Sequence, residues 1–238
     1  MMRKLAEGVF QVVLNLPNSM ELKRTFYNHL ILTAQEKVYI FSKKHNWQTY
    51  LDRPLITSLK IFASKKEFDD ALVKAFNLSE NTKVPSSIVA VFLKDRLFMV
   101  SPEVYQAVYP EGCEEDSYEK LMIHELAHNL HIRILDGEEE KMGPKWFYEG
   151  FAVYVANQFA HAKKKLSKEE LLSIVTLNKE VDYRSYKEVL EKVLQSFHLS
   201  DLVYCAWKPD FIHLITSALK NDIHDQTQDF KSIKTFFN

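Results

Sequence analysis

Two histidines and a glutamate in this sequence have the spacing of a metal site on a helix. Residues 124–128 read His-Glu-Leu-Ala-His, and residues four apart lie about one turn apart on the same helix face. The imidazoles of His124 and His128 can therefore direct nitrogens at one point, about 2.0–2.1 Å from a shared zinc ion. Glu125 is rotated by about 100° from His124 around the helix axis, so it flanks the metal without having to bind it. A carboxylate there can serve as the base for a water at the metal.

A third possible ligand is Glu149, the single acid in an otherwise apolar and aromatic stretch, residues 146–154. A glutamate in such a stretch is hard to explain as a surface residue, whereas metal binding explains it directly. Gly150 beside it costs about 1 kcal/mol relative to alanine inside a helix. We therefore expect this helix to approach the helix that carries the two histidines closely. The competing interpretation is a glutamate at the solvent-exposed edge of its helix.

The helix expected over residues 117–136 has apolar side chains around almost its whole circumference, so we expect it to be buried. Buried imidazoles and carboxylates carry a desolvation cost of several kcal/mol unless they are paired. A shared metal ion would satisfy both histidines and the glutamate together. The alternative is a set of core histidines that form hydrogen bonds with neighbouring polar groups.

The two halves of the chain differ in pattern, with β-branched and aromatic runs in the first and successive helical patterns in the second. The expected strands cover residues 38–41, 59–62, 88–92 and 97–100, with a hairpin turn at 93–96. The expected helices cover residues 20–32, 65–77, 117–136, 144–162, 184–197, 208–221 and 227–236. Helix-starting capping boxes are expected at Asp116 with Glu119 and at Ser167 with Glu170, and Gly137 is expected to end the 117–136 helix.

These elements predict an α+β fold: a small mixed β-sheet with helices in the N-terminal half and a helical C-terminal half. We assign residues 1–110 to an N-terminal α/β subdomain. Residues 111–238 form a helical subdomain that carries the metal residues, with the cleft expected between the halves.

Composition excludes several classes of function. The 238 residues include 31 basic and 32 acidic ones, so no basic field is available for nucleic acid. Cys113 and Cys205 lie far apart and outside any Cys-x-x-Cys pair, which argues against a disulfide scaffold and a thiolate zinc site. The basic start at residues 1–4 resembles an export signal, but Glu7 and Gln11 interrupt the apolar stretch that follows. No run of about 18 apolar residues suits a membrane span. We therefore expect a soluble, cytoplasmic protein.

The two motifs together resemble those of the gluzincin zinc peptidases. The His-Glu-x-x-His sequence at 124–128 is followed, after 20 residues, by Glu149 within Trp-Phe-x-Glu-Gly-Phe-Ala at 146–152. The family includes thermolysin-like and aminopeptidase-N-like enzymes and the smaller peptidase MA-like proteins. The resemblance is closest over residues 118–156 and extends loosely back to about residue 59. It implies a zincin-like architecture, a zinc cofactor and a peptide or protein substrate.

The resemblance also implies roles for individual residues. His124, His128 and Glu149 would be the zinc ligands. Glu125 would take a proton from the attacking water and return it to the leaving amine. The strand near residues 97–101 would pair with an extended substrate.

In this family a tyrosine or histidine from a later helix often donates a hydrogen bond to the oxyanion. Tyr204 falls in a plausible place for that role, with Tyr183 and Tyr186 as competitors. For any one of these tyrosines the competing interpretation is a buried side chain whose hydroxyl bonds to a backbone carbonyl.

The sequence also departs from related patterns. Thermolysin-like members have an acid four residues after the third ligand, where this chain has Val153. No Gly-x-Met-Glu-Asn exopeptidase signature precedes the motif, so nothing indicates recognition of a free amino terminus. The metzincin pattern would place a histidine where Ile134 stands. His131 lies about 10 Å along the helix from His124, so we interpret it as a residue supporting the site or lining the cleft, or equally as a core histidine.

Two rival functions follow from the same residues. The first is a non-catalytic zinc- or peptide-binding protein on the same fold, favoured by the small size and by the missing acid at Val153. The second is an interaction protein without a metal, which predicts less than one equivalent of tightly bound zinc in protein purified without chelators.

Overall fold

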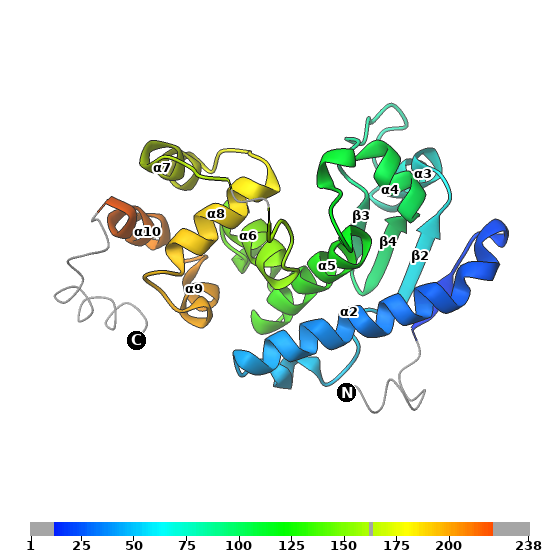
Figure 1. The fold of residues 1–238 in the computed structure, drawn as a ribbon, viewed down its shortest axis with the longest axis horizontal. Coiled ribbons are helices and arrows are strands. Elements are labelled where there is room, and N and C mark those ends of the chain that lie inside the picture. The colour runs from blue at the N-terminus through cyan, green and yellow to red at the C-terminus, as the bar shows by residue number, and fades with distance from the viewer. Residues whose placement is uncertain (1–11, 162–163, 221–238) are drawn as a thin grey trace. The chain divides into compact units, whose positions relative to one another are not determined.

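The computed structural model describes residues 12–161 and 164–220, and its fold is α+β, as predicted (Figure 1). The chain divides into two compact units, Met1–Leu130 and His131–Asn238. The boundary falls inside the helix α5 (Ser117–Ile134). The strands belong to the first unit, and the described part of the second unit is helical.

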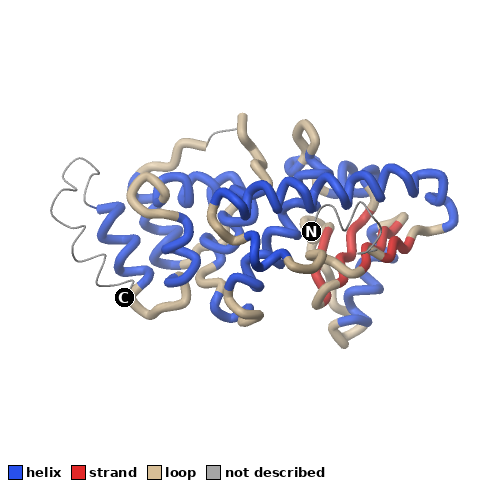
Figure 2. The backbone as a smooth tube through the Cα atoms, turned by 90° about the horizontal axis from the view of Figure 1, so that it is seen from below, coloured by secondary structure: helices blue, strands red, loops and turns tan. Residues whose placement is uncertain are grey.

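Four short strands form the mixed sheet, in the order β1-β2-β4-β3. They are β1 (Val13–Asn15), β2 (Ser58–Phe62), β3 (Ala90–Leu93) and β4 (Arg96–Val100). The first two pairings are parallel and β3 is antiparallel to β4, and Figure 2 shows the strands side by side in red. Leu59 pairs with Leu97 and Ile61 with Met99, and all four side chains are buried. Their alternation puts them on one face of the sheet, which forms part of the core.

The order of the strands corrects the prediction for substrate pairing. The strand near residues 97–101 was expected to pair with an extended substrate, but β4 has β2 on one side and β3 on the other. Its backbone donors and acceptors are therefore already used in the sheet. Among the described strands only β1 and β3 lie at an edge.

The helices of the first unit are α2 (Arg24–Lys44), α3 (Lys65–Ala75), α4 (Pro102–Val108) and the larger part of α5. Single 3-10 turns cover η1 (Asn18–Lys23), η2 (Gln48–Leu51) and η3 (Pro110–Gly112). Ser64 caps α3 by accepting from the Glu67 N–H, and Ser101 caps α4 by accepting from the Val104 N–H. The Tyr118 hydroxyl donates to the Val100 carbonyl at 2.6 Å, which fixes the start of α5 at the end of β4.

One predicted strand was wrong. Residues 38–41 lie inside α2, which is longer than the helix expected at 20–32. Buried residues recur four apart in this helix, at Leu30, Ala34 and Val38, so Val38 continues a helical apolar face. The three-residue strand β1 was not predicted because it is too short to show an alternating pattern.

Both ends of α5 are near the predicted positions, but the start uses different contacts. Asp116 has a φ of 56°, outside the extended region of an N-cap residue, and Glu119 forms an ion pair with Lys37. The capping box predicted there is therefore wrong. At the other end Asp136 has a φ of 56°, and the Gly137 N–H donates to the Ile132 carbonyl at 2.9 Å. That bond closes the helix as a Schellman motif does.

The second unit contains α6 (Lys145–Val155), α7 (Lys168–Leu177), α8 (Tyr183–Val193), α9 (Leu199–Cys205) and α10 (Phe211–Lys220). A 3-10 turn, η4 (Glu139–Lys141), precedes α6. The capping box predicted at Ser167 and Glu170 is confirmed. The helix expected from 144 to 162 ends earlier, at Val155, and the one expected at 227–236 lies outside the described residues.

Close packing between helices organises this unit. α6 packs along α8, and α7 packs against α10. The Trp146 ring at the start of α6 stacks on Phe211 of α10, with centroids 5.8 Å apart. No helix in the described part of either unit has the length and apolarity to cross a membrane. The basic start of the sequence, with Glu7 and Gln11, lies outside the described residues.

Asp182 caps the N-terminus of α8. Its carboxylate accepts from the Ser185 N–H at 2.9 Å and pairs with the Lys164 ammonium at 2.7 Å. Partial burial raises the pKa of Asp182, but Lys164 and the Ser185 N–H outweigh it, so the pKa lies below its ordinary value. A carboxyl group with a lowered pKa stabilises the folded state at pH values above its ordinary pKa. That contribution is lost as the pH falls through the folded-state pKa.

Asp182→Ala should lower the free energy of unfolding by about 1 kcal/mol at neutral pH, because α8 loses its capping acceptor. Asp182→Asn is the control: it keeps a capping oxygen and loses only the charge, so its loss should be smaller. The difference between Asp182→Asn and the parent should shrink as the pH falls below the ordinary pKa of an aspartate and through the lower folded-state pKa, because the parent carboxyl then also becomes neutral. Urea unfolding followed by circular dichroism measures both effects. Equal stability of Asp182→Ala and the parent would contradict the role of this cap.

Candidate metal centre

The helix that carries both histidines is largely buried, as predicted from its sequence. Buried apolar residues on several sides of α5 include Leu121, Met122, Ile123, Leu126, Ala127 and Leu130. His124 lies among them with only 4% of its surface exposed, while Glu125 and His128 are half-buried. The His124 imidazole therefore has little contact with water and depends on neighbouring groups for its polar interactions.

The two imidazoles meet at their Nε2 atoms. These atoms are 3.1 Å apart, and the rings are nearly perpendicular, at 84°. Two nitrogens bound to one tetrahedral zinc ion at about 2.0–2.1 Å would be about 3.3–3.4 Å apart. The observed separation is therefore close to the one a shared metal ion requires. It also suits a hydrogen bond in which one ring donates to the other.

Glu149 belongs to the same group of possible ligands. One ligand atom from each of His124, His128 and Glu149 lies within 4.8 Å of the others, and this group could hold a metal ion. Glu149 is half-buried in the middle of α6. Its neighbours in the helix include Trp146, Phe147 and Phe151, which are fully buried. Two imidazole nitrogens and one carboxylate form a donor set that suits zinc and other divalent transition metals.

Gly150 serves a different helix contact from the one predicted. A Cβ atom at this position would lie 3.0 Å from the Tyr186 carbonyl oxygen and 3.2 Å from the Leu190 Cβ. The three atoms nearest to that position all belong to α8. The expectation that Gly150 allows a close approach to the histidine helix is therefore wrong, because the close approach is to α8.

His131 is a buried residue at the C-terminal end of α5. Its exposed fraction is 0%, and its ring lies 4.7 Å from the Phe151 ring and 5.7 Å from the Phe147 ring, centroid to centroid. Both phenylalanines are on α6. His131 is not in the group of possible ligands. Of the alternatives left open by the sequence, a residue in the core beside the Glu149 helix agrees best with this packing.

The three tyrosines considered for oxyanion binding lie in different surroundings. Tyr186 is buried in α8, and its hydroxyl oxygen accepts from the Val181 N–H at 3.2 Å, which gives it a structural role. Tyr183 is half-buried at the start of the same helix. Tyr204 is 44% exposed on α9. Oxyanion binding by Tyr204 or Tyr183 stays a prediction.

Tyr148 was not singled out from the sequence, although it directly precedes Glu149. Burial raises the pKa of its phenol, and the Glu149 carboxylate raises it further. The phenol is therefore within electrostatic range of the proposed ligand. Val153, where thermolysin-like members have an acid, is fully buried, so this part of α6 contributes an apolar side chain to the core.

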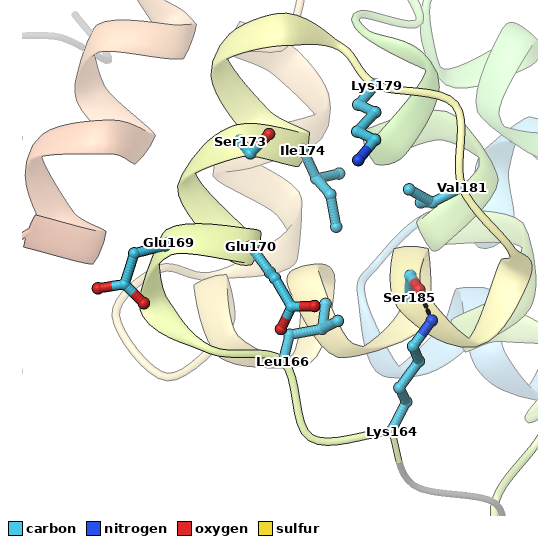
Figure 3. Close-up of a pocket in the computed structure, with 9 residues that line it drawn as sticks. All are labelled: Lys164, Leu166, Glu169, Glu170, Ser173, Ile174, Lys179, Val181 and Ser185. Atoms are coloured by element: carbon cyan, nitrogen blue, oxygen red, sulfur yellow. Dashed lines mark hydrogen bonds between the residues drawn. The ribbon is translucent and has the colours of Figure 1, made fainter.

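A pocket of about 340 Å³ lies elsewhere in the second unit, beside α7 and the start of α8 (Figure 3). The Lys164 ammonium donates to the Ser185 hydroxyl at 2.9 Å on one side, and the Lys179 side chain extends into the pocket on the other. None of the residues predicted to bind metal or to act in catalysis lines this pocket. It is therefore separate from the candidate metal centre.

Comparisons with models of known protein families, with curated proteins and with solved structures each gave no match for this chain. The gluzincin resemblance accordingly stays a prediction from the residues themselves.

If His124, His128 and Glu149 hold zinc, the ion should raise the free energy of unfolding of the full chain, because the three ligands come together only in the folded state. The rise should be about 2.7 kcal/mol when free zinc is 100 times its dissociation constant. His128→Ala removes one of three ligands and should abolish most of that rise. His213→Ala, at an exposed position on α10, is the matched control and should respond as the parent does. Thermal unfolding with and without zinc measures the effect, and an equal response of His128→Ala and the parent would exclude His128 as a ligand.

Proposed function

We propose that this chain is a zinc-dependent peptide hydrolase in which His124, His128 and Glu149 bind the metal and Glu125 is the general base. The observation that supports the proposal most strongly is the grouping of two imidazoles and one carboxylate with ligand atoms within 4.8 Å of one another. Three protein ligands on a tetrahedral zinc ion leave one position for water or substrate, the arrangement typical of catalytic zinc sites.

The chemistry of the donor set favours zinc over the alkaline-earth ions. Calcium and magnesium take oxygen ligands almost exclusively, whereas this group offers two nitrogens and one carboxylate. A hydrogen bond between the two rings would account for the approach of the two Nε2 atoms alone, whereas a shared metal ion would also use the Glu149 carboxylate of the same group. A divalent cation accounts for all three groups, because each contributes a lone pair and the carboxylate adds a compensating charge.

A zinc ion at this site would supply the Lewis acidity that lets water attack a peptide carbonyl near neutral pH. Glu125 follows His124 in α5 and is half-buried, and helix geometry sets it about 100° around the helix axis from His124, beside the two ligands. We propose that this carboxylate accepts the proton of the attacking water and then donates it to the nitrogen of the leaving amine. One group can perform both transfers because it is regenerated within the catalytic cycle. The proposed substrate is a peptide or a protein.

The non-catalytic alternative uses the same ligands and differs in one measurable property, which is turnover. A binding protein would retain zinc and would cleave nothing, and replacement of Glu125 would leave its zinc binding unchanged. The enzyme and the binding protein are therefore separated by measuring zinc content and cleavage on the same preparations.

Glu125→Gln should retain zinc, because the three proposed ligands are unchanged. It should lose activity, because an amide cannot accept the proton of the attacking water. The expected loss in rate is about 10²–10⁴-fold, the usual contribution of a general base. The measurement is elemental analysis of the purified protein together with mass spectrometry of a proteome-derived peptide library after incubation. Glu119→Gln, at a half-buried position on the same helix, is the matched control and should behave as the parent does.

Two outcomes decide between the interpretations. If Glu125→Gln cleaves as fast as the parent, Glu125 is not the base. If the parent holds one equivalent of zinc and cleaves no peptide, the non-catalytic alternative is favoured.

A further inference from the structure

We infer that Gly150 is a positioning residue for Glu149: its missing side chain lets α6 lie close against α8, and that contact fixes where the Glu149 carboxylate stands. This inference rests on the proposed metal site. Gly150 itself would touch neither metal nor substrate, and its effect would be transmitted through the helix backbone.

The space opposite Gly150 is too small for a methyl group. An added Cβ would be 3.0 Å from the Tyr186 carbonyl oxygen and 3.2 Å from the Leu190 Cβ. Ordinary contacts between a carbon and a carbonyl oxygen are about 3.3–3.6 Å long. Both atoms are fixed to the α8 backbone and cannot rotate away. Alanine at this position would therefore push α6 and α8 apart by a few tenths of an ångström.

Two further contacts tie α6 and the residues after it to α8 and its approach. The Lys145 ammonium at the start of α6 pairs with Glu180, which lies just before α8. Lys187 is a buried residue of α8, and its ammonium donates to the Gln158 carbonyl at 2.9 Å, beyond the end of α6. Together with the close contact at Gly150, these two contacts fix α6 against α8 at the start of α6, in the middle of α6 and just beyond its end.

Glu149 is sensitive to this packing because it is the residue next to Gly150. Any displacement of α6 at Gly150 moves the Glu149 backbone by a similar amount. Metal sites tolerate deviations of only about 0.2 Å in ligand distances. A shift of a few tenths of an ångström would therefore strain or lengthen the bond from the Glu149 carboxylate. Alanine favours helix more than glycine does, so helix propensity does not explain a glycine here, whereas lack of space does.

The test is Gly150→Ala in the full chain. We expect its dissociation constant for zinc to rise about 10–100-fold, the range typical for residues that orient a metal ligand. Competition with a chromogenic chelator measures the constant. The visible spectrum of the cobalt-substituted protein gives a second readout, because it responds to the geometry around the metal, and it should differ from that of the parent.

Asp182→Ala is the control for a general loss of stability. It weakens the start of α8 without adding an atom opposite Gly150, so it should lower the melting temperature and leave zinc affinity within about twofold of the parent. Parental zinc affinity and an unchanged cobalt spectrum in Gly150→Ala would overturn the inference. So would an equal loss of affinity in Asp182→Ala, because the effect would then follow stability. A parent protein that binds no zinc would instead refute the proposed function, and with it the premise of this inference.

Discussion

The burial of the His124 imidazole beside the half-buried His128 and Glu149 is the constraint on which the other features of the site depend. His124 is almost fully buried, and the Nε2 atoms of His124 and His128 are 3.1 Å apart. Groups with so little access to solvent need polar partners close by. Glu149 lies in the same group of possible ligands, so one cation can satisfy all three. The surrounding helices can then be understood as the supports that keep these side chains in place.

Those supports differ between the two helices involved. The start of α5 is fixed to the sheet through the hydrogen bond from Tyr118 to Val100, and 18 residues of regular helix then set the direction of both imidazoles. α6 is shorter, at 11 residues, and its position depends on α8 through Gly150 and the Lys187 hydrogen bond. Under the proposed function, a residue that never contacts the metal would therefore affect how well the metal is bound.

The features that depend on local pattern could be predicted from the sequence. The burial of α5, the extents of β2 and α3 and the capping box at Ser167 follow from side-chain periodicity and from single hydrogen bonds. Features that depend on distant partners were missed or misassigned. Residues 38–41 have strand propensity but lie within α2, where Val38 continues the buried apolar face. The neighbour of Gly150 could not be deduced, because a glycine indicates close approach without identifying the element that approaches.

The atoms that face Gly150 have a consequence for how this position can vary. One is a main-chain oxygen and the other is a β-carbon, which every residue except glycine carries. Exchanging the side chain of Tyr186 for any other would leave that oxygen in place. At Leu190 only glycine would remove the β-carbon, and the oxygen would still remain. No single exchange on α8 could therefore compensate for a larger residue at position 150, so related chains should conserve this glycine even where the residues opposite it differ.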